Sequence, residues 1–343
     1  MNRTVIAIDI AKKVFQLHWV VPATGVIERL RLKRSQVLDW FARCEPTLVA
    51  MEACGGAHEW ARQFQRQGHT VRLLPPKAVR PFVQRSKTDA SDAQAIWTAS
   101  QQPGFRFVPV KSEAQQAILA LHRMRSQLLK MRIMQTNELR GLLYEFGIVL
   151  PEGHAALLKT WPQIVPTLHE RLPATLVDSL LEQRRRVDAF QSDIAAVERR
   201  LAEHLKNDEK CRTIAAVPGV GLLTATAVVA TMGSPAAFAN ARQFAAWLGL
   251  TPRQRGTGGR IRQLGISKRG DAHLRTLLMH GARAAIVQAR AKQSWPWLEA
   301  ILQRRPYNVV VAAVANKIAR TVWAMLARGN AWREEAWGQP VTA

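Results

Sequence analysis

The chain has 343 residues, enough for two or three domains with a substantial core. Its 49 Lys and Arg against 25 Asp and Glu give a net charge of +24, so we expect a polyanionic partner, nucleic acid ahead of an anionic membrane surface. There is no long apolar run, no signal peptide and no zinc-like spacing of the three cysteines and nine histidines. The sequence therefore predicts a cytoplasmic protein with buried, reduced thiols.

The N-terminal part is predicted to be a three-strand meander followed by alternating helices and strands. Short apolar or alternating runs indicate the strands, and Ser35 is expected to cap the first helix. The strands are expected at residues 5–8, 14–20, 26–32, 48–51 and 71–74, and the helices at about 35–43 and 58–67. This order predicts a ribonuclease H-like α/β fold, with a mixed sheet covered by helices on both faces.

Four acids stand out against the basic background. Asp9 and Glu52 end two buried-strand runs, and the first and fourth strands can be neighbours in this fold. Asp89 and Asp92 are three residues apart on a predicted helix, so they share a face that could lie across the same edge. Gathered carboxylates repel one another unless a cation lies among them, and paired divalent metals suit phosphodiester chemistry. We predict a divalent metal site, although each acid alone would be a cap or a solvated group.

Basic residues directly precede the acidic pair. Lys77, Arg80, Arg85 and Lys87 lie in a stretch without acids between Pro75 and Thr88. They could hold a phosphate backbone beside the metals, and the alternative is a solvated loop.

Two long helical stretches are predicted at residues 113–145 and 172–205, with an irregular connection from Pro151 to Pro173. Their apolar residues recur in steps of three and four, which indicates a helical hairpin or a dimeric coiled coil. Ordinary packing against neighbouring domains is the alternative. The first seam contains Leu121, Met124, Leu128 and Met131, and the second contains Val187, Phe190, Ile194, Val197 and Leu201.

From about residue 209 the chain is predicted to be helical with glycine-rich breaks. Helices are expected at 222–232, 238–248, 271–292 and 306–328, and the tail after Gly329 is expected to be loosely ordered. Gly219 and Gly221, in Pro-Gly-Val-Gly, resemble the hairpin of helix-hairpin-helix DNA binders, where glycines let the backbone approach a phosphate. A plain tight turn explains this motif equally well.

A loop expected at 249–265 and the residues after it are strongly basic. Thr257 lies there between glycines, so its hydroxyl could attack or anchor a phosphate. The alternative is a basic DNA-binding loop in which Thr257 donates a hydrogen bond. The basic residues are Arg253, Arg255, Arg260, Arg262, Lys268, Arg269 and Arg275, against one acid, Asp271.

Together these motifs resemble those of the DEDD-type insertion-sequence transposases, over nearly the whole chain. The resemblance rests on AIDIAK at 7–12, MEACG at 51–55, KTDASDA at 87–93, VPGVG at 217–221, WLGLTPR at 247–253 and ISKRG at 266–270, with Leu274 and Arg275. It implies a RuvC-like catalytic domain at 1–108, a helical coiled-coil region at 109–208 and a transposase domain at 209–343.

The resemblance also implies roles for single residues. Asp9, Glu52, Asp89 and Asp92 would hold Mg²⁺, and the family's nucleophilic serine falls on Thr257 here. Because the methyl group of threonine crowds the hydroxyl and restricts χ1, Ser267 is the alternative nucleophile. Thr257 is favoured, since the family position is explicit and Ser267 can instead cap the next helix.

The implied activity is recombination guided by a noncoding RNA of the element, which pairs with double-stranded target and donor DNA. A homodimer or homotetramer would form a covalent protein–DNA intermediate, with the acids and the hydroxyl from different protomers. The location would be the bacterial cytoplasm, on the nucleoid when DNA is bound. The rival hypotheses are a RuvC-like junction-resolving nuclease that uses activated water and a non-enzymatic nucleic-acid-binding protein. A sugar-kinase or chaperone-type ATPase is disfavoured, because no glycine-rich loop follows Asp9.

Overall fold

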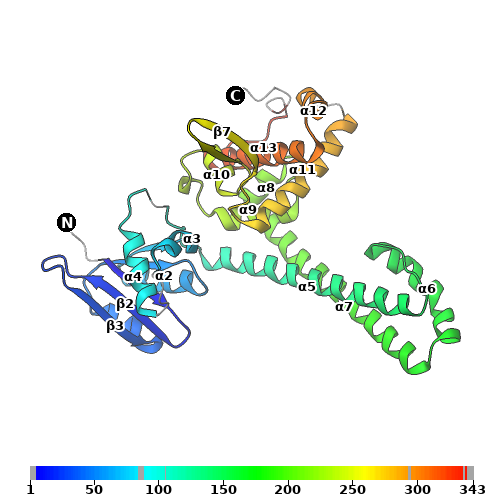
Figure 1. The fold of residues 1–343 in the computed structure, drawn as a ribbon, viewed down its shortest axis with the longest axis horizontal. Helices are drawn as coiled ribbons and strands as arrows, with labels where there is room; N and C mark the ends of the chain where they lie inside the picture. Colours follow the sequence, from blue (N-terminus) through cyan, green and yellow to red (C-terminus); the bar gives the residue numbers. More distant parts are fainter. Residues whose placement is uncertain (1–4, 84–88, 105, 293–294, 335–336, 338–343) are drawn as a thin grey trace. The chain divides into compact units, whose positions relative to one another are not determined.

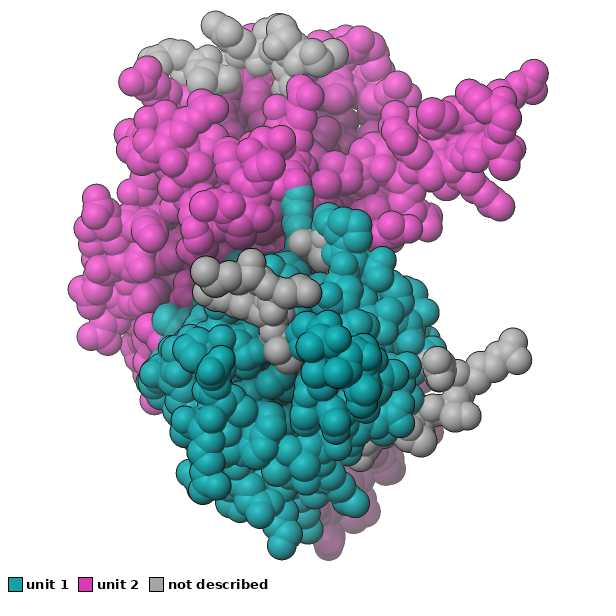
Figure 2. Space-filling view, turned by 90° about the vertical axis from the view of Figure 1, so that its left-hand side faces the viewer, with its two compact units in different colours: residues 1–113 teal, residues 114–343 magenta. Residues whose placement is uncertain are grey.

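The computed structural model describes residues 5–83, 89–104, 106–292, 295–334 and 337, with the backbone but not the side chain of Asp89. The chain divides into two compact units, Met1–Glu113 and Ala114–Ala343 (Figure 2). The first contains a mixed five-stranded sheet, and the second is mainly helical. The predicted mixture of α/β and helical parts is confirmed.

The sheet of the first unit has the strand order β3-β2-β1-β4-β5 (Figure 1). Its strands are β1 (Val5–Ile10), β2 (Val14–Val20), β3 (Ile27–Lys33), β4 (Leu48–Glu52) and β5 (Thr70–Leu74). The pairs β1–β2 and β2–β3 are antiparallel, whereas β1–β4 and β4–β5 are parallel. The five predicted strands are therefore confirmed, and the first and fourth lie side by side as expected.

Alternation of side chains along β1 and β4 builds a core on each face of this sheet. Ile8 and Met51 pack on one face with aromatic residues of α1 (Val37–Ala42) and α2 (Ala57–Arg66). Ala7 and Ala50 pack on the other face with Ile96 of α4 (Asp89–Ser100). The small alanines leave room for α4 close to the sheet. The helical elements of this unit are η1 (Arg34–Gln36), α1 (Val37–Ala42), α2 (Ala57–Arg66), α3 (Pro76–Val79), η2 (Arg80–Phe82) and α4 (Asp89–Ser100).

One predicted cap is wrong. Ser35 lies inside the 3-10 turn η1, so it does not begin the helix. Gln36, the last residue of this turn, folds its side chain back to the start of the turn. Its Oε1 accepts a hydrogen bond from the backbone N–H of Lys33 at 3.0 Å.

A long helical hairpin forms the first part of the second unit. α5 (Glu113–Glu145) and α7 (Ala174–Asn207) run antiparallel (Figure 1). Arg125 Nε donates to Glu198 Oε1 at 2.7 Å, and Gln135 Nε2 donates to Gln183 Oε1 at 2.8 Å. Of the predicted alternatives, the intrachain hairpin is thus present. The α7 seam is largely buried, whereas Met124 of the α5 seam stays 53% exposed.

The connection between these helices corrects an expectation. Instead of irregular chain, it contains the helix α6 (His154–Arg171), which includes Pro162 and Pro166. Each proline removes a helical hydrogen bond, but the buried residues Leu157, Trp161 and Leu168 pack against the ends of α5 and α7. Tertiary burial therefore outweighs local propensity. The spacing of these three residues was the missed signal.

The C-terminal helices surround one core. They are α8 (Glu209–Ala215), α9 (Leu222–Met232), η3 (Pro235–Ala237), α10 (Ala241–Trp247), α11 (Ala272–Lys292), α12 (Pro296–Leu302) and α13 (Tyr307–Arg328). The predictions for α9, α11 and α13 are confirmed to within one residue. α10 is shorter than predicted because Asn240 caps it, its Oδ1 accepting from the Gln243 N–H at 3.0 Å.

Among the described residues, α13 is the one helix that could cross a membrane by length and mean hydropathy, 1.5 over 18 residues, although the sequence was expected to contain no such segment. Its apolar face, which includes Val310, Val314, Ile318 and Val322, is buried in the C-terminal core. That burial is typical of a core helix.

Trp337, a described residue of the tail, corrects the expectation that the tail is loosely ordered. Trp337 is 2% exposed and packs against Trp295 at 4.8 Å between ring centroids. Its indole N–H donates to Thr321 Oγ1 at 3.0 Å, and its carbonyl oxygen accepts from Trp297 Nε1 and Lys317 Nζ at 2.7 and 3.1 Å. Aromatic burial and these hydrogen bonds offset the entropy of ordering this part of the tail.

The expected basic loop at 249–265 is instead a hairpin of β6 (Pro252–Thr257) and β7 (Arg260–Ile266) (Figure 1). Gly258 and Gly259 form its two-residue turn with φ of +57° and +78°. Two glycines between strands are a strong hairpin signal, which our sequence interpretation missed.

A close backbone contact holds α11 in the C-terminal core. Gly281 of α11 lies against Gly219, and a Cβ at Gly281 would overlap the Gly219 carbonyl oxygen and lie 3.0 Å from its carbon. Only residues without side chains allow this approach.

We predict that Gly281→Ala lowers the free energy of unfolding by about 1–3 kcal/mol, because backbone must move to admit the methyl group. Gly141→Ala is the matched control, since Gly141 is also within a helix and has nothing within 4 Å of its Cβ position. That variant should gain about 0.5–1 kcal/mol. Urea unfolding measures both, and equal effects of the two substitutions would contradict the packing argument.

Candidate functional site

Strand register brings two of the four predicted acids to one edge of the sheet. The last paired residues of β1 and β4 are Ile8 and Met51, and Asp9 and Glu52 come next in each strand. By alternation, both acids lie on the face that α4 covers, and both are half-buried.

The negative charge at this edge affects the pKa of Cys54, which lies two residues beyond Glu52. Burial raises the pKa of the Cys54 thiol, and the carboxylates of Glu52 and Asp9 raise it further. Both carboxylates therefore lie close enough to act on one thiol. Cys54 and Cys44 are half-buried and Cys211 is buried, and all three are free thiols, so full burial is confirmed for Cys211 alone.

The first turn of α4 carries the other two acids. Asp89 is its first residue, with a side chain outside the described part of the chain, and Asp92 is half-buried one turn later. α4 packs across β1 and β2. Within the described residues, ligand oxygens of Asp9, Glu52 and Asp92 are not all within 4.8 Å of one another. The grouping of the four acids therefore stays a prediction.

Two of the four basic residues predicted beside the acids can be placed. Lys77 and Arg80 are exposed, in α3 and η2, directly after β5. Because β1, β4 and β5 are parallel, the chain leaves β5 at the edge that carries the two acids. Arg85 and Lys87 lie outside the described residues.

In the second unit, Gly219 and Gly221 have different surroundings. Gly219 has φ of +84°, and a Cβ there would lie 2.7 Å from the Gly281 carbonyl carbon, so close packing accounts for this glycine. Gly221 is exposed at the N-terminus of α9, with open space around its Cβ position. Phosphate binding at this end of α9 stays a prediction.

Thr257 ends β6 at the tip of the hairpin, opposite Arg260. Described residues of both strands are exposed except Ile266, which is half-buried. The Thr257 hydroxyl is therefore held on paired backbone beside a tight turn, at an exposed tip. Gly256 allows the two strands to approach closely here, since a Cβ at this position would lie 2.6 Å from the Arg260 carbonyl oxygen.

Strand register gives the hairpin two unlike faces. Residues opposite each other share a face, as do alternate residues along a strand, so Arg255 and Arg262 lie on the same face as Thr257 and Arg260. Gln254, Ile261 and Gln263 lie on the other. We call the first surface the arginine face; it consists of Arg255, Thr257, Arg260 and Arg262, whereas Arg253 lies where the strand register shifts.

The alternative hydroxyl, Ser267, is half-buried at the hairpin base, where its backbone N–H donates to the Thr251 carbonyl at 2.8 Å. The expectation that Ser267 caps the next helix is wrong. Asp271 performs this role for α11, its Oδ1 accepting from the Leu274 N–H at 2.9 Å.

Three predicted nucleic-acid contacts follow the hairpin. Lys268 and Arg269 are exposed, and Lys268 has φ of +54°, the left-handed region in which non-glycine residues are uncommon. Arg275, on α11, is half-buried and donates from Nη1 to the Leu248 carbonyl at 3.0 Å. Its guanidinium is thus engaged with the protein backbone.

One group of potential metal ligands among the described side chains is accounted for by the capping of a helix. Atoms of His204, Asp208 and Cys211 lie within 4.8 Å of one another. Asp208 Oδ1 caps α8 by accepting from the Cys211 N–H at 2.8 Å. Burial, then Asp208, raises the pKa of the Cys211 thiol to about 12, so without a bound metal this thiol stays protonated.

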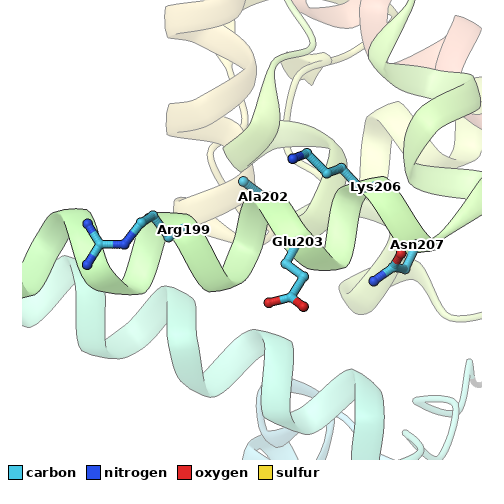
Figure 3. Close-up of a pocket in the computed structure, with 5 residues that line it drawn as sticks. All are labelled: Arg199, Ala202, Glu203, Lys206 and Asn207. Atoms are coloured by element: carbon cyan, nitrogen blue, oxygen red, sulfur yellow. The ribbon is translucent and has the colours of Figure 1, made fainter.

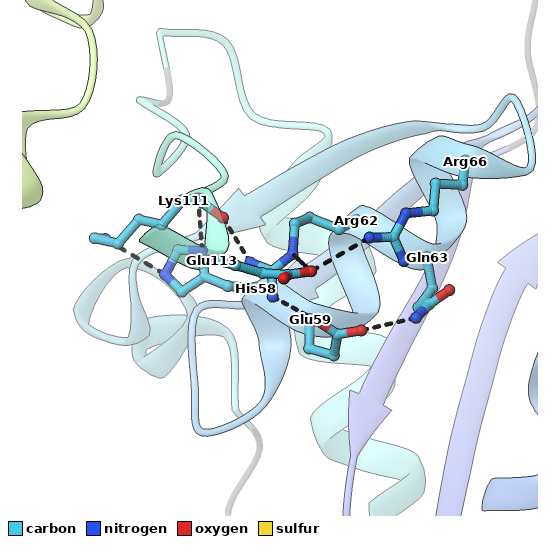
Figure 4. A network of polar contacts seen from close by, with 7 residues as sticks. All are labelled: His58, Glu59, Arg62, Gln63, Arg66, Lys111 and Glu113. Atoms are coloured by element: carbon cyan, nitrogen blue, oxygen red, sulfur yellow. Dashed lines mark hydrogen bonds and ion pairs between the residues drawn. The ribbon is translucent and has the colours of Figure 1, made fainter. Parts of the chain in front are cut away.

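Sequence reasoning missed a polar network on α2 (Figure 4). His58 Nδ1 accepts from the Lys111 N–H at 3.2 Å, and Arg62 Nη1 donates to the Lys111 carbonyl at 2.6 Å. Arg62 and Arg66 pair with Glu113 at 3.9 and 3.3 Å. The network ties the start of α5 to α2. The i, i+4 spacing of His58, Arg62 and Arg66 was the available signal.

A hollow of about 550 Å³ lies along α7 (Figure 3). Its charged groups are of both signs and come from one helix, so we assign it no binding chemistry. The lining residues are Arg199, Ala202, Glu203, Lys206 and Asn207.

Two parts of the chain match models of transposase families. Residues 6–148 match the IS110-type DEDD model described as Transposase, and residues 211–296 match the model described as Transposase IS116/IS110/IS902 family. The first match contains the four acids and the second contains the hairpin.

Relatives that are similar over almost their whole length carry transposase names. A probable family 20 transposase of Pseudomonas aeruginosa is 46% identical, covering 97% of this chain and 99% of the relative. The transposase for insertion sequence element IS1328 of Yersinia enterocolitica is 38% identical over 96% and 98%. The transposase for IS1111A of Coxiella burnetii is 37% identical over 96% and 91%. These matches show that this chain belongs to the IS110/IS116 family of insertion-sequence transposases, enzymes that cut and rejoin DNA.

Proposed function

We propose that this transposase recombines DNA under the guidance of a noncoding RNA of its element, through a covalent link between Thr257 and DNA. The observation that carries the proposal is the position of Thr257, exposed at the tip of a hairpin and on one face with arginines. The divalent metal would be held in a ribonuclease H-like domain, a fold that the strand order of the first unit supports.

The chemistry of the donor set fits Mg²⁺. Asp9 and Glu52 offer carboxylate oxygens at neighbouring strand ends, and Asp89 and Asp92 are in the first turn of the helix on that face. Hard divalent cations prefer such ligands. When bound, Mg²⁺ would stabilise charge on the scissile phosphate and favour deprotonation of the attacking hydroxyl. Lys77, Arg80, Arg85 and Lys87 would hold the neighbouring phosphate backbone.

The arginine face would supply the rest of the reaction centre. Its guanidinium groups can bind the phosphate and stabilise negative charge on its oxygens in the transition state. The Thr257 oxygen would attack phosphorus and lose its proton, and the bond to a DNA oxygen would break, leaving a phosphothreonine and a free DNA hydroxyl. A hydroxyl of the partner strand would then attack this phosphothreonine and restore Thr257. The number of phosphodiester-type bonds is conserved, so no ATP is required.

Thr257 is a better candidate than Ser267 because of its accessibility. Thr257 is exposed at the tip, whereas Ser267 is half-buried at the base, where both strands meet. The expected capping role of Ser267 no longer contributes to this choice.

Assembly would complete the site. We propose that the regions 1–108, 109–208 and 209–343 act as catalytic, coiled-coil and transposase domains, and that acids and hydroxyl come from different protomers of a dimer or tetramer. The exposed α5 side chains Met124, Met131 and Met134, which are 53%, 40% and 70% exposed, support self-association through this region.

We predict that replacing Asp9, Glu52, Asp89 or Asp92 by Ala lowers Mg²⁺-dependent strand cleavage at least about 100-fold, since a metal supplies several kcal/mol of charge stabilisation. Without metal the variants should be as stable as the unchanged protein or more so, because carboxylate repulsion is relieved. Mg²⁺ should raise the melting temperature of the unchanged protein and not of Asp9→Ala. Asp39→Ala, at an exposed acid of the same unit, is the control. Full recombination by Asp89→Ala would refute the metal site.

We predict that Thr257→Val binds RNA and DNA normally but forms no covalent adduct, because valine keeps the β-branched shape and lacks the hydroxyl. Thr257→Ala should behave in the same way, and Thr257→Ser should remain active. Ser267→Ala should lose less activity than Thr257→Ala. Peptide mass spectrometry of the adduct trapped on a nicked substrate identifies the linked residue. A link at Ser267 would show that the wrong hydroxyl was chosen, and cleavage without any adduct would favour activated water.

We predict that the purified protein carries RNA and elutes larger than a monomer. Its affinity for RNA and DNA should fall steeply with salt, because basic side chains release counterions from the phosphates. Arg255→Gln should reduce the salt slope by about one, and Arg186→Gln, at an exposed arginine of α7, should leave it unchanged. A monomer free of nucleic acid that recombines DNA without added RNA would contradict RNA guidance.

A further inference from the structure

The hairpin that carries Thr257 has little support along its length. Its two strands pair only with each other among the described residues, and nearly all of their side chains are exposed on both faces. An isolated two-stranded hairpin is marginally stable in water. Its direction must therefore be fixed where the two strands leave the core.

Both strands are tied to each other at this base. The Ser267 N–H donates to the Thr251 carbonyl at 2.8 Å, and the Lys268 N–H donates to the Gly249 carbonyl at 3.1 Å. The two segments also touch through their backbones. A Cβ at Gly249 would lie 2.7 Å from the Arg269 nitrogen, and a Cβ at Gly270 would overlap the Trp247 carbonyl group.

Arg275 of α11 bridges the incoming and outgoing segments. Its Nη1 donates to the Leu248 carbonyl before β6, at 3.0 Å, and to the Gly270 carbonyl after β7, at 3.4 Å. Leu248, whose carbonyl accepts one of these hydrogen bonds, and Leu274, the residue before Arg275, both have fully buried side chains. One guanidinium thus connects both ends of the hairpin to the rigid helix α11.

Asn316 of α13 adds a second tie. Its Nδ2 donates to the carbonyl oxygen of Leu250 at 3.3 Å, one residue before Thr251. Leu250 is 2% exposed, so the hydrogen bond is made at the edge of the C-terminal core. The carbonyls of Leu248, Leu250 and Gly270 are therefore all held by side chains of core helices.

We infer that Arg275 and Asn316 are positioning residues, which orient the β6–β7 hairpin so that its tip meets the scissile phosphate. This inference rests on the proposed role of the hairpin in catalysis. It replaces the prediction that Arg275 binds nucleic acid, because its Nη1 is directed to two backbone carbonyls. Neither residue touches the reacting atoms; each acts through the backbone of the hairpin base.

Arg275→Lys tests the inference, since lysine keeps the charge but cannot reproduce the planar arrangement of donors. The rate of strand cleavage at saturating DNA should fall about 100-fold, because a small displacement of the reacting groups can lower a rate by about this factor. The dissociation constant for DNA and its salt slope should not change. Amide hydrogen exchange should accelerate at Ser267 and Lys268, whose N–H groups close the base. Arg283→Lys, the same change on α11, is the control and should alter none of these.

Asn316→Ala provides an independent arm if Arg275→Lys does not fold. It should slow cleavage about 10-fold, with unchanged DNA affinity and faster exchange at the same two amides. Arg275→Gln distinguishes positioning of the hairpin from binding of a phosphate, because glutamine has no charge. If Arg275 contacts a phosphate, the neutral variant will weaken DNA binding and reduce the salt slope by about one, and the inference is overturned.

Cleavage is scored as nicked DNA, so the test does not depend on which hydroxyl attacks. If Thr257→Val still cleaves, the proposed nucleophile is wrong, yet the effect of Arg275→Lys on cleavage and exchange can still be read. If Thr257→Val is inactive while Arg275→Lys and Asn316→Ala cleave and exchange like the unchanged protein, the positioning inference alone fails.

Discussion

Parallel pairing of β1 with β4 is the constraint on which the first unit depends. It places Ile8 beside Met51 and, one step further, brings the ends that carry Asp9 and Glu52 to the same edge. Two strands that are distant in sequence can meet in this way only because the meander and α1 return the chain between them. Alternation then directs both acids to the α4 face, and the opposite residues form the aromatic core.

Close backbone contact plays the corresponding part in the second unit. Gly219 meets Gly281, and Gly270 meets Trp247, so the C-terminal core approaches both the turn before α9 and the base of the hairpin without intervening side chains. For the proposed nucleophile Thr257, an anchored base and an exposed tip would suit a phosphate that belongs to a large, separate molecule. The core fixes direction, and exposure leaves room for nucleic acid.

The two units also differ in the charged side chains that they present. The carboxylates lie at a sheet edge, next to the half-buried thiol of Cys54 whose pKa they raise, whereas the hairpin presents arginines on one face. Cations beside a hydroxyl and acids suited to a divalent metal are complementary halves of phosphoryl-transfer chemistry. The acids lie in the first compact unit, and the hairpin lies in the second.

The sequence alone determined those features that depend on local pattern. The five strands, the long helices α5 and α7, and the acids at strand ends follow from hydrophobic period and residue type. Tertiary structure decided the rest. The segment with Pro162 and Pro166 is helical because Leu157, Trp161 and Leu168 are buried, and Trp337 of the tail is buried because it packs into the C-terminal core. The arginine face exists through strand register, and the engagement of Arg275 depends on carbonyls brought to it by folding. The spacing of Leu157, Trp161 and Leu168 is a local signal, but strand register and the carbonyls that meet Arg275 join distant segments and leave no periodic signal, so only the folded chain reveals them.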